Sequence, residues 1–99
     1  MYKKELEAQI LKRIPEHERE TYRTMRKLNR INKQLLWQLI RDSNKENVTI
    51  YKGKKTDLEV LLNKRLISIN KAYKSKGQEM SLFVLVRAPY LIRVLKREF

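Results

Sequence analysis

The sequence predicts a small, predominantly helical α+β domain. Three observations predict this class. Apolar residues recur at helical spacing over residues 16–43, a helix-start motif precedes a second periodic segment at residues 57–75, and two short segments are rich in β-branched and aromatic residues. Because the chain has 99 residues, we expect one domain, residues 1–99, with a single modest core. An all-α bundle is the alternative fold.

A proline separates the first two predicted helices. Residues 3–14 carry apolar side chains at helical spacing, and Pro15 ends this segment because its ring clashes with the preceding turn and removes a donor. The same proline suits the start of the long helix of residues 16–43. Carboxylates in a first turn stabilise the positive end of the helix dipole. Three glutamates fall in that turn: Glu16, Glu18 and Glu20.

The long amphipathic helix has two opposed faces. The apolar face carries Met25, Leu28, Leu35, Leu36 and Leu39, with Tyr22, Ile31 and Ile40 at its margins. The opposite face carries a basic stripe made of Arg19, Arg23, Arg26, Arg30, Lys33, Trp37 and Arg41. The single tryptophan therefore lines up with cations and away from the leucines. We expect this stripe to be an exposed surface that receives an anionic molecule.

Two short strands and a second capped helix are predicted in the second half of the chain. Residues 47–51 and 80–87 favour strands because they are rich in β-branched and aromatic residues. A turn at residues 52–55 follows the first strand, and Gly53 is expected there at positive φ. The two strands would form a β-α-β unit or a small mixed pair.

The helix of residues 57–75 lies between those strands. It starts at a capping box, with Thr56 at the cap and Glu59 three residues later, and Gly77 is placed to cap its end. A last short helix is predicted for residues 90–97, opened by Pro89; a single kinked helix over residues 80–98 is the competing interpretation.

The composition indicates a polyanionic partner and disfavours catalysis. Lysine and arginine outnumber aspartate and glutamate by 24 to 11, a net charge of +13 that is spread along the chain without a basic tail. The chain has no cysteine, one histidine, no glycine-rich nucleotide loop and no grouped acids. We therefore expect a protein that is not an enzyme and that uses no metal or cofactor.

The sequence also predicts a cytoplasmic protein. The longest apolar run, residues 82–86, is far too short to cross a bilayer. Glu5 and Glu7 interrupt any signal-like segment near the start. A lipid-inserting helix is disfavoured because Trp37 lies on the basic side rather than with the leucines, so no membrane partner is expected.

The leading functional hypothesis is non-catalytic nucleic-acid binding through phosphate contacts. Arginine matches phosphate oxygens with a planar fork, and an aromatic ring in the same stripe can stack on an unpaired base. RNA or single-stranded DNA is therefore slightly favoured over duplex, with Trp37, Tyr51 and Tyr73 as the available rings. A second phosphate anchor is predicted beside the start of the second helix, at Lys52, Lys54 and Lys55.

The rival hypothesis is a basic adaptor or inhibitor that docks on an acidic protein surface. Val60 and Ile67 fall opposite the apolar face of the predicted helix, so either a second layer covers them or they contact a partner. Lys64 and Lys71 flank them and complete the candidate docking surface. A homodimer formed through the long helix is a third possibility.

Overall fold

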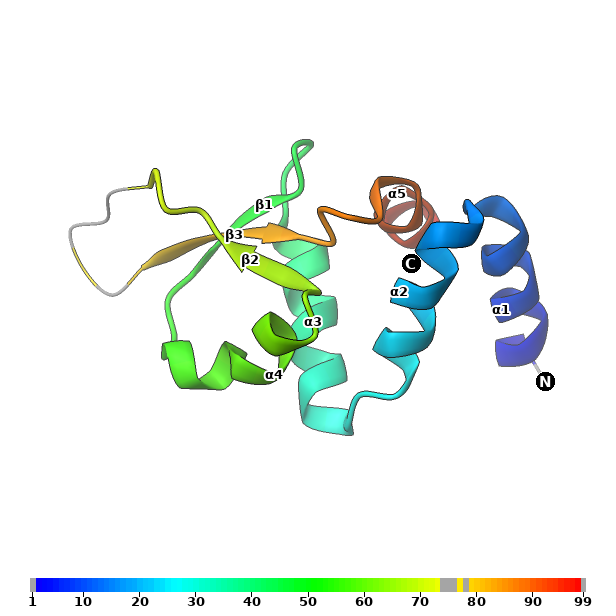
Figure 1. Ribbon diagram of the computed structural model, residues 1–99, viewed down its shortest axis with the longest axis horizontal. Coiled ribbons are helices and arrows are strands. Elements are labelled where there is room, and N and C mark those ends of the chain that lie inside the picture. Colours follow the sequence, from blue (N-terminus) through cyan, green and yellow to red (C-terminus); the bar gives the residue numbers. More distant parts are fainter. Residues whose placement is uncertain (1, 74–76, 78, 99) are drawn as a thin grey trace.

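The fold is helix-dominated α+β, as the sequence predicts. The computed structural model describes residues 2–73, 77 and 79–98 (Figure 1). Along the chain it contains α1 (Tyr2–Arg13), α2 (Glu16–Arg26), α3 (Arg30–Asp42), β1 (Val48–Tyr51), the 3-10 helix η1 (Lys55–Leu58), α4 (Glu59–Asn63), β2 (Ile67–Ile69), β3 (Met80–Val84) and α5 (Pro89–Glu98).

The strands form a three-stranded antiparallel sheet with β3 in the centre and β1 and β2 at its edges. Thr49 of β1 lies opposite Leu82, and Ser68 of β2 lies opposite Phe83. Strands form within both predicted segments, but β3 ends at Val84, so residues 85–87 of the predicted segment 80–87 lie outside it. The predicted β-α-β unit or mixed pair is wrong, because a third strand forms where helix was expected.

The long helix predicted for residues 16–43 is also wrong, because it breaks into α2 and α3. Asn29 caps α3: its side-chain oxygen accepts a hydrogen bond from the Asn32 backbone N–H at 2.9 Å. Leu28, at the break, is buried in the core. The Asn29 side chain accepts an N–H group of the first turn of α3, which in a continuous helix would bond to a carbonyl of the preceding turn. The chain therefore reverses, and α2 and α3 form the two arms of a hairpin (Figure 1).

The second predicted helix, residues 57–75, ends early at Asn63. Arg65 adopts a left-handed φ of 60°, Leu66 N–H donates to Leu61 O at 3.0 Å, and Arg65 N–H donates to Leu62 O at 3.0 Å. This is the hydrogen-bond pattern of a Schellman helix end. Leu66 O then accepts Leu85 N–H at 2.8 Å, which starts the pairing of β2 with β3.

Two predictions about the ends of that helix are also wrong: the cap at Gly77 and the capping box of Thr56 and Glu59. The helix that Gly77 is predicted to cap ends at Asn63, and residues 74 and 75 of the predicted helix lie outside the described part of the chain. The predicted capping box of Thr56 and Glu59 does not form; instead, two residues earlier, the Asp57 carboxylate accepts the Lys54 N–H at 3.3 Å.

Replacing Arg65 with glycine is expected to raise the free energy of unfolding by about 1 kcal/mol, because glycine adopts positive φ without the clash that a Cβ causes there. Lys64 is the matched control: its φ is −87°, so glycine there brings only extra chain entropy. Lys64→Gly should lower stability by about 0.5–1 kcal/mol. Urea denaturation of both variants measures the difference, and two shifts of the same sign would contradict the assignment of strain to Arg65.

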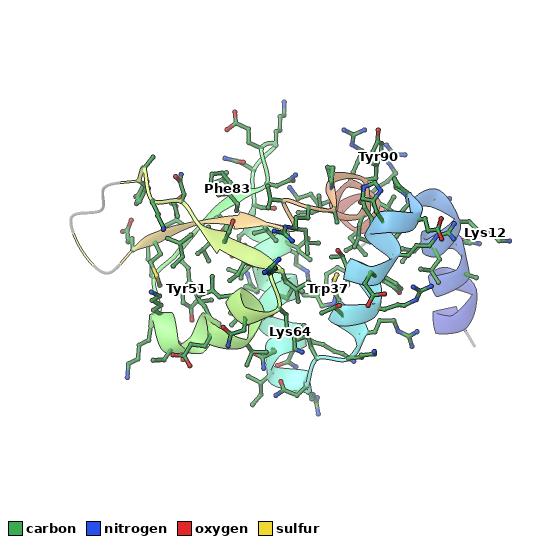
Figure 2. The ribbon with its side chains drawn as sticks, in the orientation of Figure 1. Lys12, Trp37, Tyr51, Lys64, Phe83 and Tyr90 are labelled. Carbon is green, nitrogen blue, oxygen red and sulfur yellow. The ribbon has the colours of Figure 1, made fainter. Side chains whose placement is uncertain are left out.

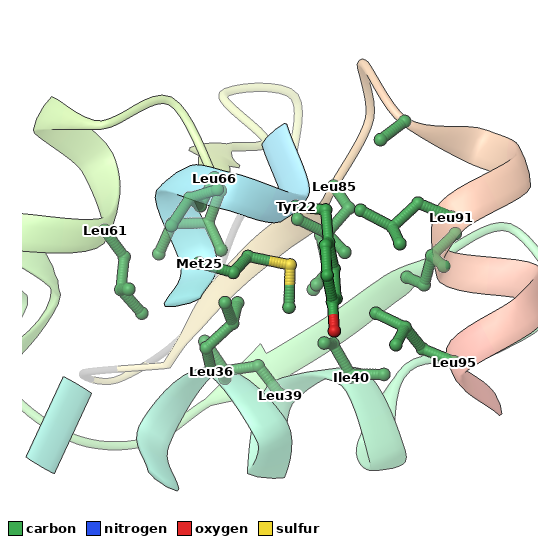
Figure 3. Close-up of a cluster of buried hydrophobic side chains, with 14 of the residues drawn as sticks. Tyr22, Met25, Leu36, Leu39, Ile40, Leu61, Leu66, Leu85, Leu91 and Leu95 are labelled. Atoms are coloured by element: carbon green, nitrogen blue, oxygen red, sulfur yellow. The ribbon is translucent and has the colours of Figure 1, made fainter. Parts of the chain in front are cut away.

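One core joins the helical end of the molecule to the sheet. α3 packs against β1, α4 and α5, and α5 also packs against α1 and α2. Tyr22 and Met25 of α2 reach between the leucines and isoleucine of α3 and the leucines of α5 (Figure 3). α3 and α5 are therefore the central elements.

A buried carboxylate fixes the start of α5. Glu18 of α2 is fully buried, and its carboxylate accepts N–H groups from Leu91 at 2.8 Å and from Tyr90 at 3.5 Å. These are donors of the first turn of α5, which have no partner within that helix. The sequence predicts that Glu18 stabilises the start of its own helix, α2. In the structure it caps α5 instead, about 70 residues later in the chain. Glu16 and Glu20 are exposed, and Glu20 lies beyond the first turn of α2, where the sequence predicts it.

Candidate functional site

The break between α2 and α3 divides the predicted basic stripe. Arg19, Arg23 and Arg26 belong to α2, and the other members belong to α3. Arg19 has a structural role, because its Nε donates to Leu11 O at 2.9 Å in the last turn of α1. The prediction that Arg19 belongs to an exposed row of cations available to an anion is therefore wrong. Arg23 stays exposed and lies 3.5 Å from the Glu20 carboxylate.

Three stripe residues nonetheless meet, from two helices. A cleft of about 300 Å³ lies between α2 and α3, with Arg26 on one side and Lys33 and Trp37 on the other. Figure 2 shows Trp37 between these helices. The rest of the lining is mostly apolar: Tyr22, Met25, Leu28 and Leu36. The hairpin thus turns a linear stripe into an apolar hollow with a cationic rim.

Trp37 is half-buried and packs against the core, so the expectation of an indole lying in open solvent is wrong. Its ring also lines a second hollow of about 270 Å³, together with Arg41 and Lys96. The indole is therefore a wall shared by two hollows. Arg26 and Lys33 lie beside one of them, and Arg41 and Lys96 lie beside the other.

Lys96 is the residue that the sequence did not reveal. Its Nζ donates to Ser43 O at 3.2 Å, to Asn44 O at 2.8 Å and to Asn47 Oδ1 at 3.3 Å. These oxygens follow the end of α3, so the ammonium group ties α5 to that end. Burial lowers the pKa of Lys96 from its ordinary value. Nothing in the periodicity of residues 90–97 indicates this contact, because the two segments are about 50 residues apart.

All three cations of α3 are available to an external anion. Arg30, Lys33 and Arg41 are exposed, and within the described residues none of them lies within ion-pair distance of a carboxylate. A cation left without an internal partner adds its full field to the surface potential. The α3 part of the predicted stripe thus remains a positively charged surface.

The predicted phosphate anchor at residues 52–55 is built differently from expectation. Gly53 does not have positive φ; a Cβ at this position would collide with the outer end of the Tyr51 ring unless that side chain moved. Tyr51 donates its hydroxyl to Asp57 at 3.0 Å. Burial raises the pKa of Tyr51, and the Asp57 carboxylate raises it further. The Asp57 carboxylate accepts the Lys54 N–H at 3.3 Å at the start of the 3-10 helix, and Lys52, Lys54 and Lys55 are exposed around it.

The predicted partner-binding surface is split by the fold. Ile67 is only 2% exposed and belongs to the core, whereas Val60 on α4 is 38% exposed. Lys64 and Lys71 are both exposed. The second-layer explanation therefore holds for Ile67, and Val60 remains open to solvent.

Comparisons with models of protein families, with curated proteins and with solved structures find no match to this chain. Over the described residues, none of the helices combines the length and the apolar character that crossing a membrane requires.

Proposed function

We propose that this protein binds single-stranded nucleic acid, without catalysis, through the cleft between α2 and α3. An unstacked base lies against the indole of Trp37, and the flanking phosphates contact Arg26 and Lys33 at the rim. Arg41 continues the phosphate path along α3. The observation that carries this proposal is the half-buried indole that walls an open hollow between cations from two helices.

The size and lining of the cleft favour a single base. Its volume of about 300 Å³ is at the small end of ligand pockets, and its interior is mainly apolar with charged groups at the edge. A planar base needs this combination, because its faces stack on aromatic and apolar groups while its phosphates stay in water. Stacking of this kind contributes about 1–3 kcal/mol per base.

Single strands are favoured over duplex because the ring is recessed. In a duplex every base is stacked between its neighbours, so none can reach an indole that forms the wall of a cleft. The overall charge of +13 draws any polyanion to the surface, and the cleft then selects strands whose bases are free.

The proposal is tested by a double charge reversal, Lys33→Glu with Arg41→Glu. Both residues are exposed, so the fold should be retained. Binding of a single-stranded oligonucleotide, followed by Trp37 fluorescence, is expected to weaken by at least about tenfold. The slope of log affinity against log salt should fall by about 1.4, that is about 0.7 for each lost phosphate contact.

The matched control is Lys71→Glu with Arg87→Glu, which changes the net charge equally on a different face. It should weaken binding much less. Equal weakening by both double variants would reduce the interaction to general charge attraction and refute the cleft. Stronger quenching by duplex than by single strands would refute the proposed ligand.

A further inference from the structure

A third hollow, which we call the loop hollow, lies where the loop after α3 meets α5. Its volume is about 470 Å³, compared with about 300 Å³ for the cleft of Trp37. None of the residues that line it is acidic or aromatic. Its polar lining comes from Asn44, Lys45 and Asn47 of the loop and from Arg93 and Lys96 of α5. The loop hollow is therefore a cationic site with no ring on which a base could stack.

The positive charge around the loop hollow is not neutralised by carboxylates. Lys45 and Arg93 are exposed, and Lys96 uses its N–H groups on three neutral oxygens, so its charge remains although its donors are occupied. Within the described residues, none of these three cations lies within ion-pair distance of a carboxylate. Glu46 of the same loop is exposed and is not part of the lining. An anion in the loop hollow is therefore attracted by all three cations.

The Arg93 guanidinium is suited to an oxyanion. Its central carbon lies over the Tyr90 ring, 5.9 Å from the ring centre, which is the geometry of a cation–π contact. Such a contact uses the face of the guanidinium. The N–H donors along its edge remain available, and their planar fork matches the oxygens of a phosphate group.

Two side-chain amides add donors to these cations. Asn44 Oδ1 accepts Glu46 N–H at 2.9 Å and Val48 N–H at 3.1 Å, and Asn47 Oδ1 accepts the Lys96 ammonium at 3.3 Å. Because these donors fix the oxygen of each amide, the NH₂ group is the end that is left for an outside acceptor. Within the described residues, no acceptor bonds to either NH₂ group. The loop hollow thus combines cations with neutral donors, as phosphate oxygens require.

The loop hollow is linked to the cleft through the hollow of Arg41. That hollow shares Trp37 with the cleft, and it shares Ser43 and Lys96 with the loop hollow. Ser43 follows Trp37 by six residues, so the loop hollow begins about 9 Å beyond the indole along the axis of α3. A strand with a base at Trp37 reaches the loop hollow only when it extends past Arg41.

We propose that the loop hollow binds a phosphate group through Lys45, Arg93 and the amides of Asn44 and Asn47. In a clause that rests on the proposed function, this phosphate belongs to the strand whose base lies at Trp37. The cleft takes the base, and the loop hollow takes backbone, which carries no sequence information. Affinity therefore depends on strand length and not on the identity of the bases beyond the cleft.

Pyrophosphate, which carries no base, tests the phosphate site alone. In the isotope-labelled full chain it should shift the side-chain amide resonances of Asn44 and Asn47. Asn63 is the matched control, because it is an exposed asparagine beside two exposed cations, Lys64 and Arg65, and it lies outside the loop hollow. Equal shifts at Asn63, or no shift at Asn44 and Asn47, would overturn the proposal.

Charge reversal locates the phosphate. The loop pair, Lys45→Glu with Arg93→Glu, changes two exposed residues of the loop hollow and should abolish the pyrophosphate shifts. The control pair, Lys71→Glu with Arg87→Glu, changes the net charge equally beside β2 and should leave the shifts in place. Loss of the shifts in both pairs, or in neither, would contradict the assignment of the phosphate to the loop hollow.

Strand length separates this proposal from the proposed function. A dinucleoside monophosphate has one phosphate and occupies the cleft alone, whereas an oligonucleotide of about eight nucleotides reaches both sites. The loop pair should weaken the longer strand by at least about tenfold and lower its salt slope by about 0.7, for one lost phosphate contact. It should leave the dinucleoside unchanged. The cleft pair, Lys33→Glu with Arg41→Glu, should weaken both ligands.

The two proposals fail in different ways. If the loop pair weakens the longer strand no more than the control pair does, the loop hollow is refuted and the cleft is not. If the cleft pair affects neither ligand and Trp37 fluorescence does not change, the cleft is refuted. The pyrophosphate shifts at Asn44 and Asn47 then still decide whether the loop hollow binds phosphate.

Discussion

Replacing Glu18 with alanine is expected to lower the free energy of unfolding by about 3 kcal/mol, because two N–H groups at the start of α5 lose their acceptor. The carboxylate is fully buried and bonds to Leu91 and Tyr90. Urea denaturation followed by helical circular dichroism measures the loss.

Two further variants show whether the loss comes from the missing hydrogen-bond acceptor, from the missing charge or from the dipole of α2. Glu18→Gln retains an acceptor oxygen but loses the negative charge at the positive end of α5, so an intermediate loss of about 1–2 kcal/mol is expected. Glu16→Ala, an exposed acid two residues earlier on the same helix, should change stability by no more than about 0.5 kcal/mol. Equal losses for Glu16 and Glu18 would show that the acids act only through the dipole of α2.

The second large effect is expected at Ile40, where truncation to alanine should cost about 4 kcal/mol. Ile40 is 1% exposed and lies in the core between α3 and α5 (Figure 3). Removing its side chain leaves a cavity where the two central helices meet. The cost combines lost burial with the cavity that close packing cannot refill.

Ile31 provides the matched control on the same helix. It is 76% exposed, so Ile31→Ala should change stability by no more than about 0.5 kcal/mol, aided by the higher helix propensity of alanine. The sequence placed both isoleucines at the margins of one apolar face. Comparable losses at the two positions would mean that α3 packs in a different rotation from the one described.

The elements that the sequence predicted correctly depend on neighbours within a few residues. Pro15 separates α1 from α2, and Pro89 begins α5, because proline acts on its own turn of chain. β1 forms where Val48 and Tyr51 flank two more strand-favouring residues. The helix break had a local signal too, the cap-forming Asn29, but the periodicity of the apolar residues across it concealed the break.

The candidate site could be predicted only as a set of residues and not as a shape. Arg26, Lys33 and Trp37 were identified as one stripe, and the cations of α3 are exposed as expected. Their arrangement around a cleft depends on the hairpin at Asn29. Lys96 could not be found, because its acceptors after α3 come close only when α5 packs on α3.

The sequence by itself determined the helix-rich α+β class, the cationic surface and the positions of the first and last helices. Only the tertiary structure decided that residues 67–69 form a strand, that Glu18 caps α5 and that Trp37 lies in a wall between two hollows. The reason is physical: caps, prolines and side-chain periodicity act over one or two turns of chain. Strand pairing and burial depend on which distant residues supply hydrogen bonds and apolar contacts once the core has formed.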